Sequence, residues 1–483
     1  MAPAVFVLLL AGCSRKFQPP VHSFSVDPPQ SWKAESTLQG ASPRDDWWAA
    51  FADGGLDAAI SEALTRNQDL RAAAARIDAA EAEARIAGAA GQPNLELSLS
   101  RGRQRQNFVG LPIPGNEGRV LSTTYTTAGL GLDFSWEADL WGRIKSGHLA
   151  ALANVQAQEA DLAGARLSLS GQAAKAWFAA IEAQRQLGVA RDTLESYRVS
   201  AERVRARFER GLKPSLDLRL ALTEVSRAEA LLQQRREQLD AALRQLEILV
   251  GRYPSAEYVL AEDLPRVPAG VPAGLPSELV HRRPDLAAAE RRLLAADARI
   301  EQARAELRPR FSLTSGTGTA SNQLRDLLNN DVFVWNFLGG VVQPFFNGGR
   351  LKAGVRLNEA RAREAAATYE DALLSAYGEV ETALAAEQML AEREAALEDA
   401  TRQSLAARDL AEQRYQAGLT DITTVLTAQR SALESESQLL AVRRTRLDNR
   451  VNLYLALGGG FRSESITAPP PASSFSSAKE PTT

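Results

Sequence analysis

Residues 69–100 read DLRAAAARIDAAEAEARIAGAAGQPNLELSLS, and residues 285–316 read DLAAAERRLLAADARIEQARAELRPRFSLTSG. The two stretches align at one shift of 216, which places Asp69 on Asp285 and Pro93 on Pro309. Further along, the shift becomes 207, and RFERGL at 207–212 matches RYQAGL at 414–419. Self-similarity at a long fixed spacing indicates two copies of one structural unit of about 200 residues. The sequence therefore predicts an internal two-fold structural repeat, arranged as a pseudo-symmetric ring or barrel.

Composition favours long packed helices. The chain has 483 residues, a net charge of −3 and a charged fraction of 24%, with stretches rich in Ala, Leu, Glu, Arg and Gln. No basic excess points to a nucleic-acid partner. With one Cys and three His, an intrachain disulfide is impossible and a Cys/His metal site is disfavoured. We expect no metal and no cofactor other than a covalent lipid.

The lipid expectation rests on Cys13. It follows the apolar run 5–10 and the small residues Ala11 and Gly12, as in a bacterial lipobox. This predicts a lipoprotein signal peptide over 1–12, with Cys13 as the acylated first residue of the mature chain. Ser14 resembles the outer-membrane sorting choice, although no Lys or Arg precedes the apolar run. Residues 13–45 contain several prolines and read as a lipid-anchored extended strap.

The first copy is expected over 46–253. Leu95, Leu97 and Leu99 alternate with polar residues, which is a strand pattern. We predict strands over about 94–103 and 123–136, followed by a long helix hairpin over 142–252 that turns at Gly211. After that turn, apolar residues recur every seven positions, as in a coiled coil: Leu218, Val225, Leu232, Leu239 and Leu246.

The second copy is expected over 277–460, after a Pro/Gly-rich linker at 254–276. It repeats the strands at about 309–319 and 332–346 and the long helix hairpin at 349–457. The tail at 461–483 is rich in Ser and Pro and is expected to be disordered.

Four strands per chain cannot close a barrel, whereas three chains would supply twelve strands. After residue 13, no run of 18 apolar residues provides a membrane-spanning helix. The alternative for the strands is a small soluble sheet that caps a helical bundle.

Several longer motifs resemble one family. They are SWEADLWGR (135–143), PAGLPSELVHRRPD (272–285), QPFFNGGRL (343–351), RYQAGLTDITTVLTAQ (414–429) and VNLYLALGGG (451–460). They are similar to the signatures of TolC-like outer membrane efflux proteins, and the lipobox places the chain nearest the lipoprotein branch of RND efflux systems (NodT-type). The resemblance implies a mainly α fold with a small membrane β part. It implies a homotrimer, in which an outer-membrane β-barrel is continuous with a long α-helical periplasmic barrel.

The implied function is the exit duct of a tripartite RND-type efflux pump, which passively exports small toxic compounds and is not an enzyme. The implied partners are a periplasmic adaptor protein, an inner-membrane RND transporter and outer membrane lipid, with no nucleic acid. The implied location is the cell outer membrane, with an extension into the periplasm.

The resemblance also implies a constriction at the periplasmic tip of the helices. Its acidic ring positions fall here on Thr424 and Thr427, and the acids nearby are Asp421 and Asp217. A threonine ring would be neutral where an aspartate ring selects cations. The tip-turn residues are Arg414, Tyr415, Gly418 and Gly211, of which Arg414 and Tyr415 could take part in the bonds that hold the tip shut. The alternative is ordinary helix surface and turn packing.

Other residues are expected at junctions and at the membrane boundary. Helix–strand junctions are predicted at Pro93, Pro309, Gly142, Gly348 and Gly349. The tryptophans Trp136, Trp141 and Trp335, together with Phe345, could form an aromatic girdle or pack internally. Loops 103–122 and 319–331 are expected to face outside the cell.

Two other functions fit parts of the sequence. One is the outer membrane duct of a type I protein secretion system. The other is a periplasmic coiled-coil scaffold lipoprotein without a pore. Enzyme motifs such as a phosphate-binding glycine loop or a nucleophile motif are not found in the sequence.

Overall fold

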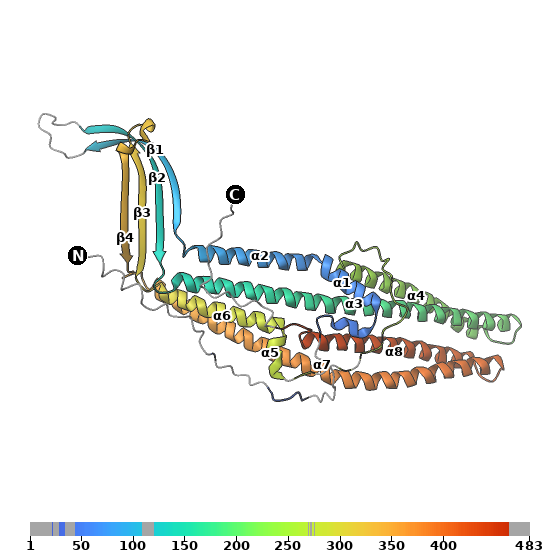
Figure 1. Cartoon of the computed structure of the whole chain (residues 1–483). Coiled ribbons are helices and arrows are strands. Elements are labelled where there is room, and N and C mark those ends of the chain that lie inside the picture. Colours follow the sequence, from blue (N-terminus) through green and yellow to red (C-terminus); the bar gives the residue numbers. More distant parts are fainter. Residues whose placement is uncertain are drawn as a thin grey trace, which may run out of the picture. The chain divides into compact units, whose positions relative to one another are not determined.

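The structure is a computed structural model that describes residues 22, 29–33, 44–108, 120–268, 270, 273–274 and 276–462. They fall into two compact units (Figure 1). One unit draws on 1–23, 78–155 and 291–367, and the other on 24–77, 156–290 and 368–483. The predicted signal peptide at 1–12, the predicted lipidation site Cys13, most of the predicted strap at 13–45 and residues 463–483 of the predicted tail lie outside the described residues.

The two halves of the chain repeat one order of elements. The first half contains η1 (Trp47–Phe51), α1 (Gly54–Arg66), α2 (Gln68–Ala89), β1 (Asn94–Phe108), β2 (Leu121–Ala138), α3 (Arg143–Glu209) and α4 (Ser215–Leu249). The second contains η2 (Pro276–Glu278), α5 (Leu279–Arg282), α6 (Pro284–Ala305), β3 (Arg310–Ser321), η3 (Leu324–Asp326), η4 (Asn330–Val332), β4 (Phe333–Val342), α7 (Arg350–Gln416) and α8 (Ile422–Ala456). Helices α3 and α7 each have 67 residues, and α4 and α8 each have 35.

The strand bounds differ from the expected ones in a way that the chemistry explains. Strand β1 continues past 103 to Phe108, because its ladder with β2 persists until Phe108 pairs with Leu121. Strand β4 ends at Val342 and does not reach 346. Pro344 follows closely and has no N–H to donate to a ladder, which favours an early end. The Gln343 side chain instead donates to the Leu307 carbonyl at 3.1 Å.

The four strands lie side by side in one antiparallel sheet of order β1-β2-β3-β4, so β1 and β4 are its edges (Figure 1). Paired residues share a face, and the register therefore fixes what each face carries. One face, here called the apolar face, carries Leu95, Leu97, Leu99, Leu130, Leu132, Phe134, Trp136, Phe311, Leu313, Phe333, Trp335, Phe337 and Val341. Its polar members on β3 are small: Ser315, Thr317, Thr319 and Ser321.

The opposite face is mostly polar or small, and is here called the polar face. It carries Glu96, Ser98, Ser100, Gly129, Gly131, Asp133, Ser135, Ser312, Thr314, Gly316, Gly318 and Asn336, with Val334, Leu338 and Val342 added by β4. No residue of β1 is buried, and Leu97 is 72% exposed. The apolar face therefore has no cover within the described part of the chain.

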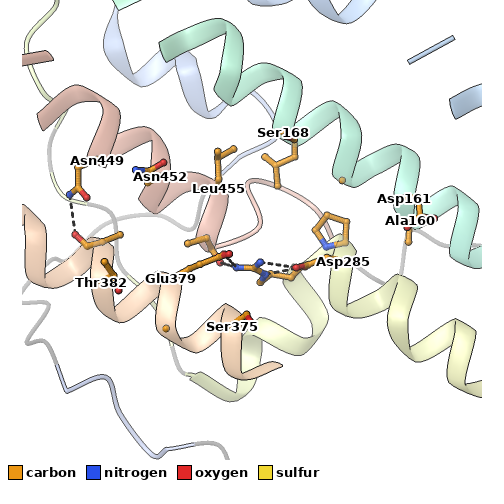
Figure 2. A pocket seen from close by; sticks show the side chains of 17 residues that line it. Ala160, Asp161, Ser168, Asp285, Ser375, Glu379, Thr382, Asn449, Asn452 and Leu455 are labelled. Carbon is orange, nitrogen blue, oxygen red and sulfur yellow. Dashed lines mark hydrogen bonds and ion pairs between the residues drawn. The ribbon is translucent and has the colours of Figure 1, made fainter. Parts of the chain in front are cut away.

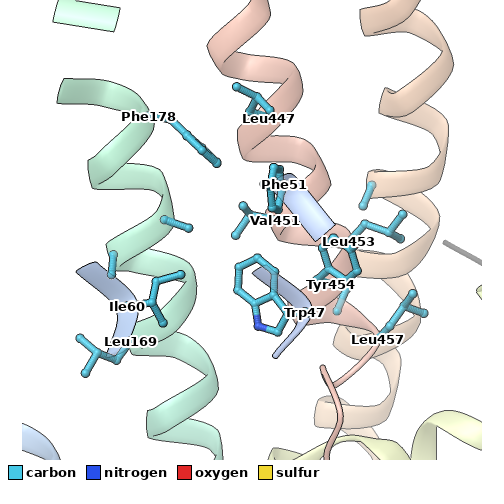
Figure 3. Packing of buried hydrophobic residues seen from close by; sticks show 14 of the residues in the cluster. Trp47, Phe51, Ile60, Leu169, Phe178, Leu447, Val451, Leu453, Tyr454 and Leu457 are labelled. Carbon is cyan, nitrogen blue, oxygen red and sulfur yellow. The ribbon is translucent and has the colours of Figure 1, made fainter. Parts of the chain in front are cut away.

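The other unit has its own hydrophobic core (Figure 3). Trp47 of η1 stacks on Tyr454 of α8 with ring centroids 5.2 Å apart, and Phe51 packs against Phe178 of α3. The indole N–H of Trp177 donates to Asp53, which also caps the start of α1. These contacts fix the segment at the start of the first copy to the long helices.

Among the helices that the structure describes, none is both long and apolar enough to cross a membrane.

Candidate functional site: the tips of the helix hairpins

The turn that ends α3 and the turn that ends α7 share one geometry. Leu212 N–H donates to the Arg207 carbonyl and Gly211 N–H to the Phe208 carbonyl, at 2.9 and 2.8 Å. This is a Schellman motif, which needs a left-handed residue where Gly211 has φ +73°. At the second tip, Leu419 and Gly418 make the same two bonds to Arg414 and Tyr415. Both hairpins therefore turn in the same way, as the repeat predicts.

The two tips are joined by a side chain that the sequence analysis did not single out. The Arg207 guanidinium donates to the carbonyls of Tyr415 and Gln416, at 3.0 and 2.9 Å. The same guanidinium lies over the Tyr415 ring, 4.7 Å from its centroid. A cation at the last carbonyls of α7 is stabilised by the negative end of that helix. Arg207 therefore connects the first and second hairpins, and this set of contacts is here called the Arg207 latch.

Tyr415 is the buried partner in this latch. Its ring is 4% exposed, and the Lys213 ammonium lies 5.6 Å from the ring centroid on the turn of the other hairpin. Burial raises the pKa of the Tyr415 phenol, and the nearby Arg207 partly opposes that rise. The ring therefore stays neutral at neutral pH and offers its face to two cations.

Asp421 begins α8 as its N-cap. Its Oδ1 accepts from the Thr424 N–H at 2.8 Å and from the Thr424 hydroxyl at 2.7 Å. These bonds from Thr424 hold the pKa of the Asp421 carboxyl below its ordinary value. Thr424 and Thr427 are both exposed on α8. Asp217 lies in the first turn of α4, where an acid favours the helix N-terminus.

Further along the hairpins, a buried polar network connects α3, α7 and α8. The Gln429 amide is 3% exposed and donates to Ser196, Ser200 and Glu412, at 2.9, 3.1 and 2.8 Å. The Glu224 carboxylate on α4 pairs with Arg430 on α8 at 3.1 Å. The two hairpins are therefore bound at several levels behind the tip.

Of the tip residues expected from sequence, the structure brings Tyr415, Gly418, Asp421 and Thr424 together at the second tip. Arg414 stands apart, because its side chain is exposed and forms no hydrogen bond or ion pair with the described residues. The repeat aligns Arg207 with Arg414, so the sequence alignment was the signal that could have pointed to Arg207.

The junction residues lie where helices meet strands. Pro93 directly precedes β1 and Pro309 directly precedes β3. Gly142 and Gly349, matched by the shift of 207, have φ of +77° and +82° just before α3 and α7. The indole of Trp141 donates to the Pro309 carbonyl at 2.7 Å, which links the two copies at this level.

A pocket of about 940 Å³ lies between α3, α7, α8 and the start of α6 (Figure 2). Arg283 lies at its edge and binds Asp285 through two nitrogens, at 3.0 and 2.7 Å, and Glu379 at 2.6 Å. It also donates to the Ala456 carbonyl at 3.1 Å. With these partners, Arg283 connects the start of α6 to α7 and α8. In the described residues, no group of three or more His, Cys, Asp or Glu is placed to hold a metal ion.

Comparison with known proteins agrees with this geometry. The profile of the outer membrane efflux protein family matches residues 59–252 and 275–459, one stretch in each copy. The pyoverdine export outer membrane protein OpmQ of Pseudomonas putida is 34% identical, over 95% of this chain and 97% of its own. Outer membrane protein OprJ of Pseudomonas aeruginosa is also 34% identical, over 95% of each chain.

The structure of the outer-membrane channel OprN is 28% identical in sequence and superposes with a TM-score of 0.83, covering 92% of this chain and 99% of that one. The match spans the sheet and both helix hairpins. The chain therefore belongs to the outer membrane efflux protein family and is an efflux exit channel of the outer membrane.

Proposed function

We propose that three copies of this chain form the exit duct of a tripartite RND-type efflux pump. The observation that carries this proposal is the sheet, which has an uncovered apolar face and two unpaired edges, β1 and β4. A sheet in lipid needs every edge paired. If β4 of each copy pairs with β1 of the next, twelve strands close into a barrel with the apolar face toward lipid and the polar face toward the pore.

The helix hairpins then extend the duct into the periplasm. Each 67-residue helix is roughly 100 Å long at 1.5 Å per residue. Six such hairpins in a ring form a helical barrel whose tips dock on a periplasmic adaptor protein and an inner-membrane RND transporter. The duct is passive, because its energy comes from that transporter. The lipid on Cys13 would fasten the strap to the outer membrane.

The tips form the resting gate in this proposal. Thr424 and Thr427 lie exposed at the start of α8, where the six hairpins of three chains would converge. The Asp421 cap and the Arg207 latch hold this segment in place. Asp217 and Asp421 add negative charge beside a neutral threonine constriction.

Arg414 completes the gate across subunits. Arg207 caps α7 from the first hairpin, and the repeat places Arg414 in the equivalent position on the second. In a pseudo-six-fold ring, Arg414 would reach the carbonyls at the end of α3 in the next subunit. Its exposed side chain in the single chain supports this assignment.

A cysteine pair tests that contact. Cys13 is the only native cysteine, so a chain carrying Arg414→Cys and Glu209→Cys can be oxidised without competing pairs elsewhere in the helices. We expect covalent oligomers on a denaturing gel. A control that pairs Arg414→Cys with Glu202→Cys, about two turns away on α3, should remain monomeric. Equal cross-linking of both pairs would contradict the assignment.

The cargo is proposed to be small organic compounds. The name of the relative OpmQ describes the export of pyoverdine, a small molecule. This chain contains only two Met, one Cys and three His, which offers few soft ligands for a relay of metal ions.

Single-channel conductance in planar bilayers tests the whole proposal. We expect low conductance from the wild type and a clear rise with Thr424→Gly combined with Thr427→Gly. The neighbouring exposed Thr423→Gly is the control for helix weakening, and it should not open the channel. A monomer without conductance would instead favour the coiled-coil scaffold. Equal conductance in wild type and double variant would place the gate elsewhere.

A further inference from the structure

Three arginines of β1 share a face of the sheet that should otherwise contact lipid. Arg101, Arg103 and Arg105 continue the same alternate positions as Leu95, Leu97 and Leu99. Alternate residues of a strand point to one side and are roughly 7 Å apart. The apolar face of β1 therefore changes, along one row, from three leucines to three arginines.

These arginines lack acidic partners in the described residues. Their cross-strand partners on β2 are Ala128, Thr126 and Thr124, which are small and uncharged. The acids within the four strands, Glu96, Asp133 and Glu137, all lie on the polar face.

All three arginines are exposed. Among the described residues, the row makes one side-chain hydrogen bond, from Arg105 to the Ser122 hydroxyl at 2.8 Å. The positive charge of the row is therefore not compensated by any of the described residues.

The register places the row at the end of the sheet farthest from the helices. All four connections to helices, before β1 and β3 and after β2 and β4, lie at the other end. Strand β3 ends at Ser321, which pairs with Ala128, the partner of Arg101. Beyond Arg101, β1 and β2 pair only with each other within the chain.

The distance from the helix end of the sheet to the arginine row is close to the height of the apolar band of a membrane barrel. From Trp136 to Ala128 the strand spans roughly 27 Å, and a tilt of about 40° reduces this to about 20 Å, close to the ~25 Å apolar band of such barrels. The row begins where that band ends. Unpaired arginines within hydrocarbon would be costly, so this row belongs at the level of lipid head groups.

We propose that Arg101, Arg103 and Arg105 bind the phosphates of a phosphorylated glycolipid of the outer leaflet, lipopolysaccharide. The inference rests on the proposed barrel, in which the helices point into the periplasm and this end of the sheet faces outward. Guanidinium groups bind phosphate oxygens in pairs of parallel hydrogen bonds, which ammonium groups do not reproduce. A row of three on one strand suits a head group that carries more than one phosphate.

The test measures binding of purified bisphosphorylated lipid A to the full-length trimer in detergent. In a variant with Arg101→Gln, Arg103→Gln and Arg105→Gln, we expect at least about tenfold weaker binding. The matched control removes three arginines of α4, the exposed Arg219 and Arg236 and the half-exposed Arg235, by Arg219→Gln, Arg235→Gln and Arg236→Gln, and should bind within about twofold of wild type. Lysine at the three strand positions should give intermediate affinity.

Two further arms identify the lipid. Lipid A from which the phosphates have been removed should bind wild type weakly. Phosphatidylglycerol, an anionic lipid without the sugar phosphates, should also bind more weakly than lipid A. If phosphatidylglycerol binds as tightly, or if the glutamine variant binds lipid A normally, the proposal is overturned. If the glutamine variant does not assemble, the affinity of the lysine variant for lipid A and the affinity of wild type for dephosphorylated lipid A still test the proposal.

Conductance separates this proposal from the function on which it rests. A glutamine variant that conducts like wild type but loses lipid A supports both. One that conducts and still binds lipid A overturns the lipid site alone. A wild-type protein that neither trimerises nor conducts overturns the duct itself, and the lipid site with it.

Discussion

At the scale of single residues, the tip depends on side chains that close helix ends. Arg207 donates to two terminal carbonyls of α7 from another hairpin, and one of them, that of Tyr415, also accepts from the Gly418 N–H of the turn. Asp421 accepts from one of the first backbone donors of α8, the Thr424 N–H. A gate built from helix termini can open when such a cap is lost, without any change in the helices behind it.

Replacing Arg207 by alanine should loosen the second tip. The two bonds from a charged donor are partly exposed, and their loss should cost about 1–2 kcal/mol. This corresponds to roughly tenfold faster amide exchange in the turn at 417–419, with a rise in channel conductance. Hydrogen exchange followed by mass spectrometry measures the first effect and bilayer recording the second.

The control for this experiment is Arg203→Ala, one turn earlier on α3, where the side chain is exposed. It removes the same charge without touching α7. Unchanged exchange in the Arg207 variant, or equal effects in both variants, would show that Arg207 is not a latch.

The Asp421 cap predicts a dependence of the gate on pH. The pKa of Asp421 is lowered in the folded state by its bonds from Thr424, so its stabilising effect is complete above the ordinary carboxyl pKa and is lost as pH falls through the lower folded pKa. Conductance should therefore rise at strongly acidic pH. In Asp421→Asn, an amide caps the helix without titrating, and this acidic rise should be smaller. An identical acid response in both proteins would contradict the prediction.

At the scale of elements, the repeat made much of the fold predictable. Long proline-free segments and heptads such as Leu218 to Leu246 indicate helix hairpins, and Leu95 to Leu99 indicate a strand. Residues 104–108 of β1 were missed because QRQNF lacks apolar alternation, and its pairing with β2 is what makes it a strand. Arg207 was missed because its role depends on a contact with Tyr415, 208 positions away. Periodic patterns in a sequence indicate which residues of a helix or strand are buried. A single contact between two helix ends leaves no such pattern.

The interface of α3 with α8 contains a buried acid that should shape stability. Desolvation raises the pKa of Asp448 to about 6, although Arg444 and Lys175 oppose this rise. The folded state therefore holds this proton more tightly than the unfolded chain. Its contribution to stability is greatest below the ordinary carboxyl pKa near 4, and it falls as pH rises through about 6.

Asp448→Asn should remove that part of the pH dependence. We expect the free energy of unfolding of the variant to rise relative to wild type by on the order of 1–2 kcal/mol as pH increases from 4 to 7, which raises its thermal unfolding midpoint relative to wild type. Loss of the bond to Arg444 at 2.6 Å reduces the gain, although Arg444 retains Glu182. Thermal melts followed by circular dichroism across this range measure it. A variant that is less stable than wild type by a constant amount at every pH would show that the ion pair outweighs the burial.

At the scale of the whole molecule, the sheet and the helices place their apolar residues differently: the helices bury them and the sheet exposes them. The helices bury their apolar residues against each other, as Trp47, Phe178 and Tyr454 do. The sheet exposes its apolar face and gathers the acids of its strands on the other. Within one chain this would be a liability for aggregation. The exposed apolar face is required if three sheets close around a pore within lipid. The proposed duct therefore depends on the proposed trimer.

Neighbouring residues of β1 allow a test of that arrangement. Leu97 lies on the apolar face and Ser98 on the polar face. Arginine at Leu97 would face the middle of the lipid layer, at a cost of about 2–4 kcal/mol per chain, so Leu97→Arg should sharply reduce the amount of trimer recovered from outer membranes. Ser98→Arg would face the pore beside Asp133 and should assemble normally, with ion selectivity shifted toward anions. Membrane fractionation and reversal potentials in a salt gradient measure the two effects. If both variants assemble equally well, the apolar face does not meet lipid. If only Leu97→Arg assembles, the two faces are reversed and the pore is lined by the leucines.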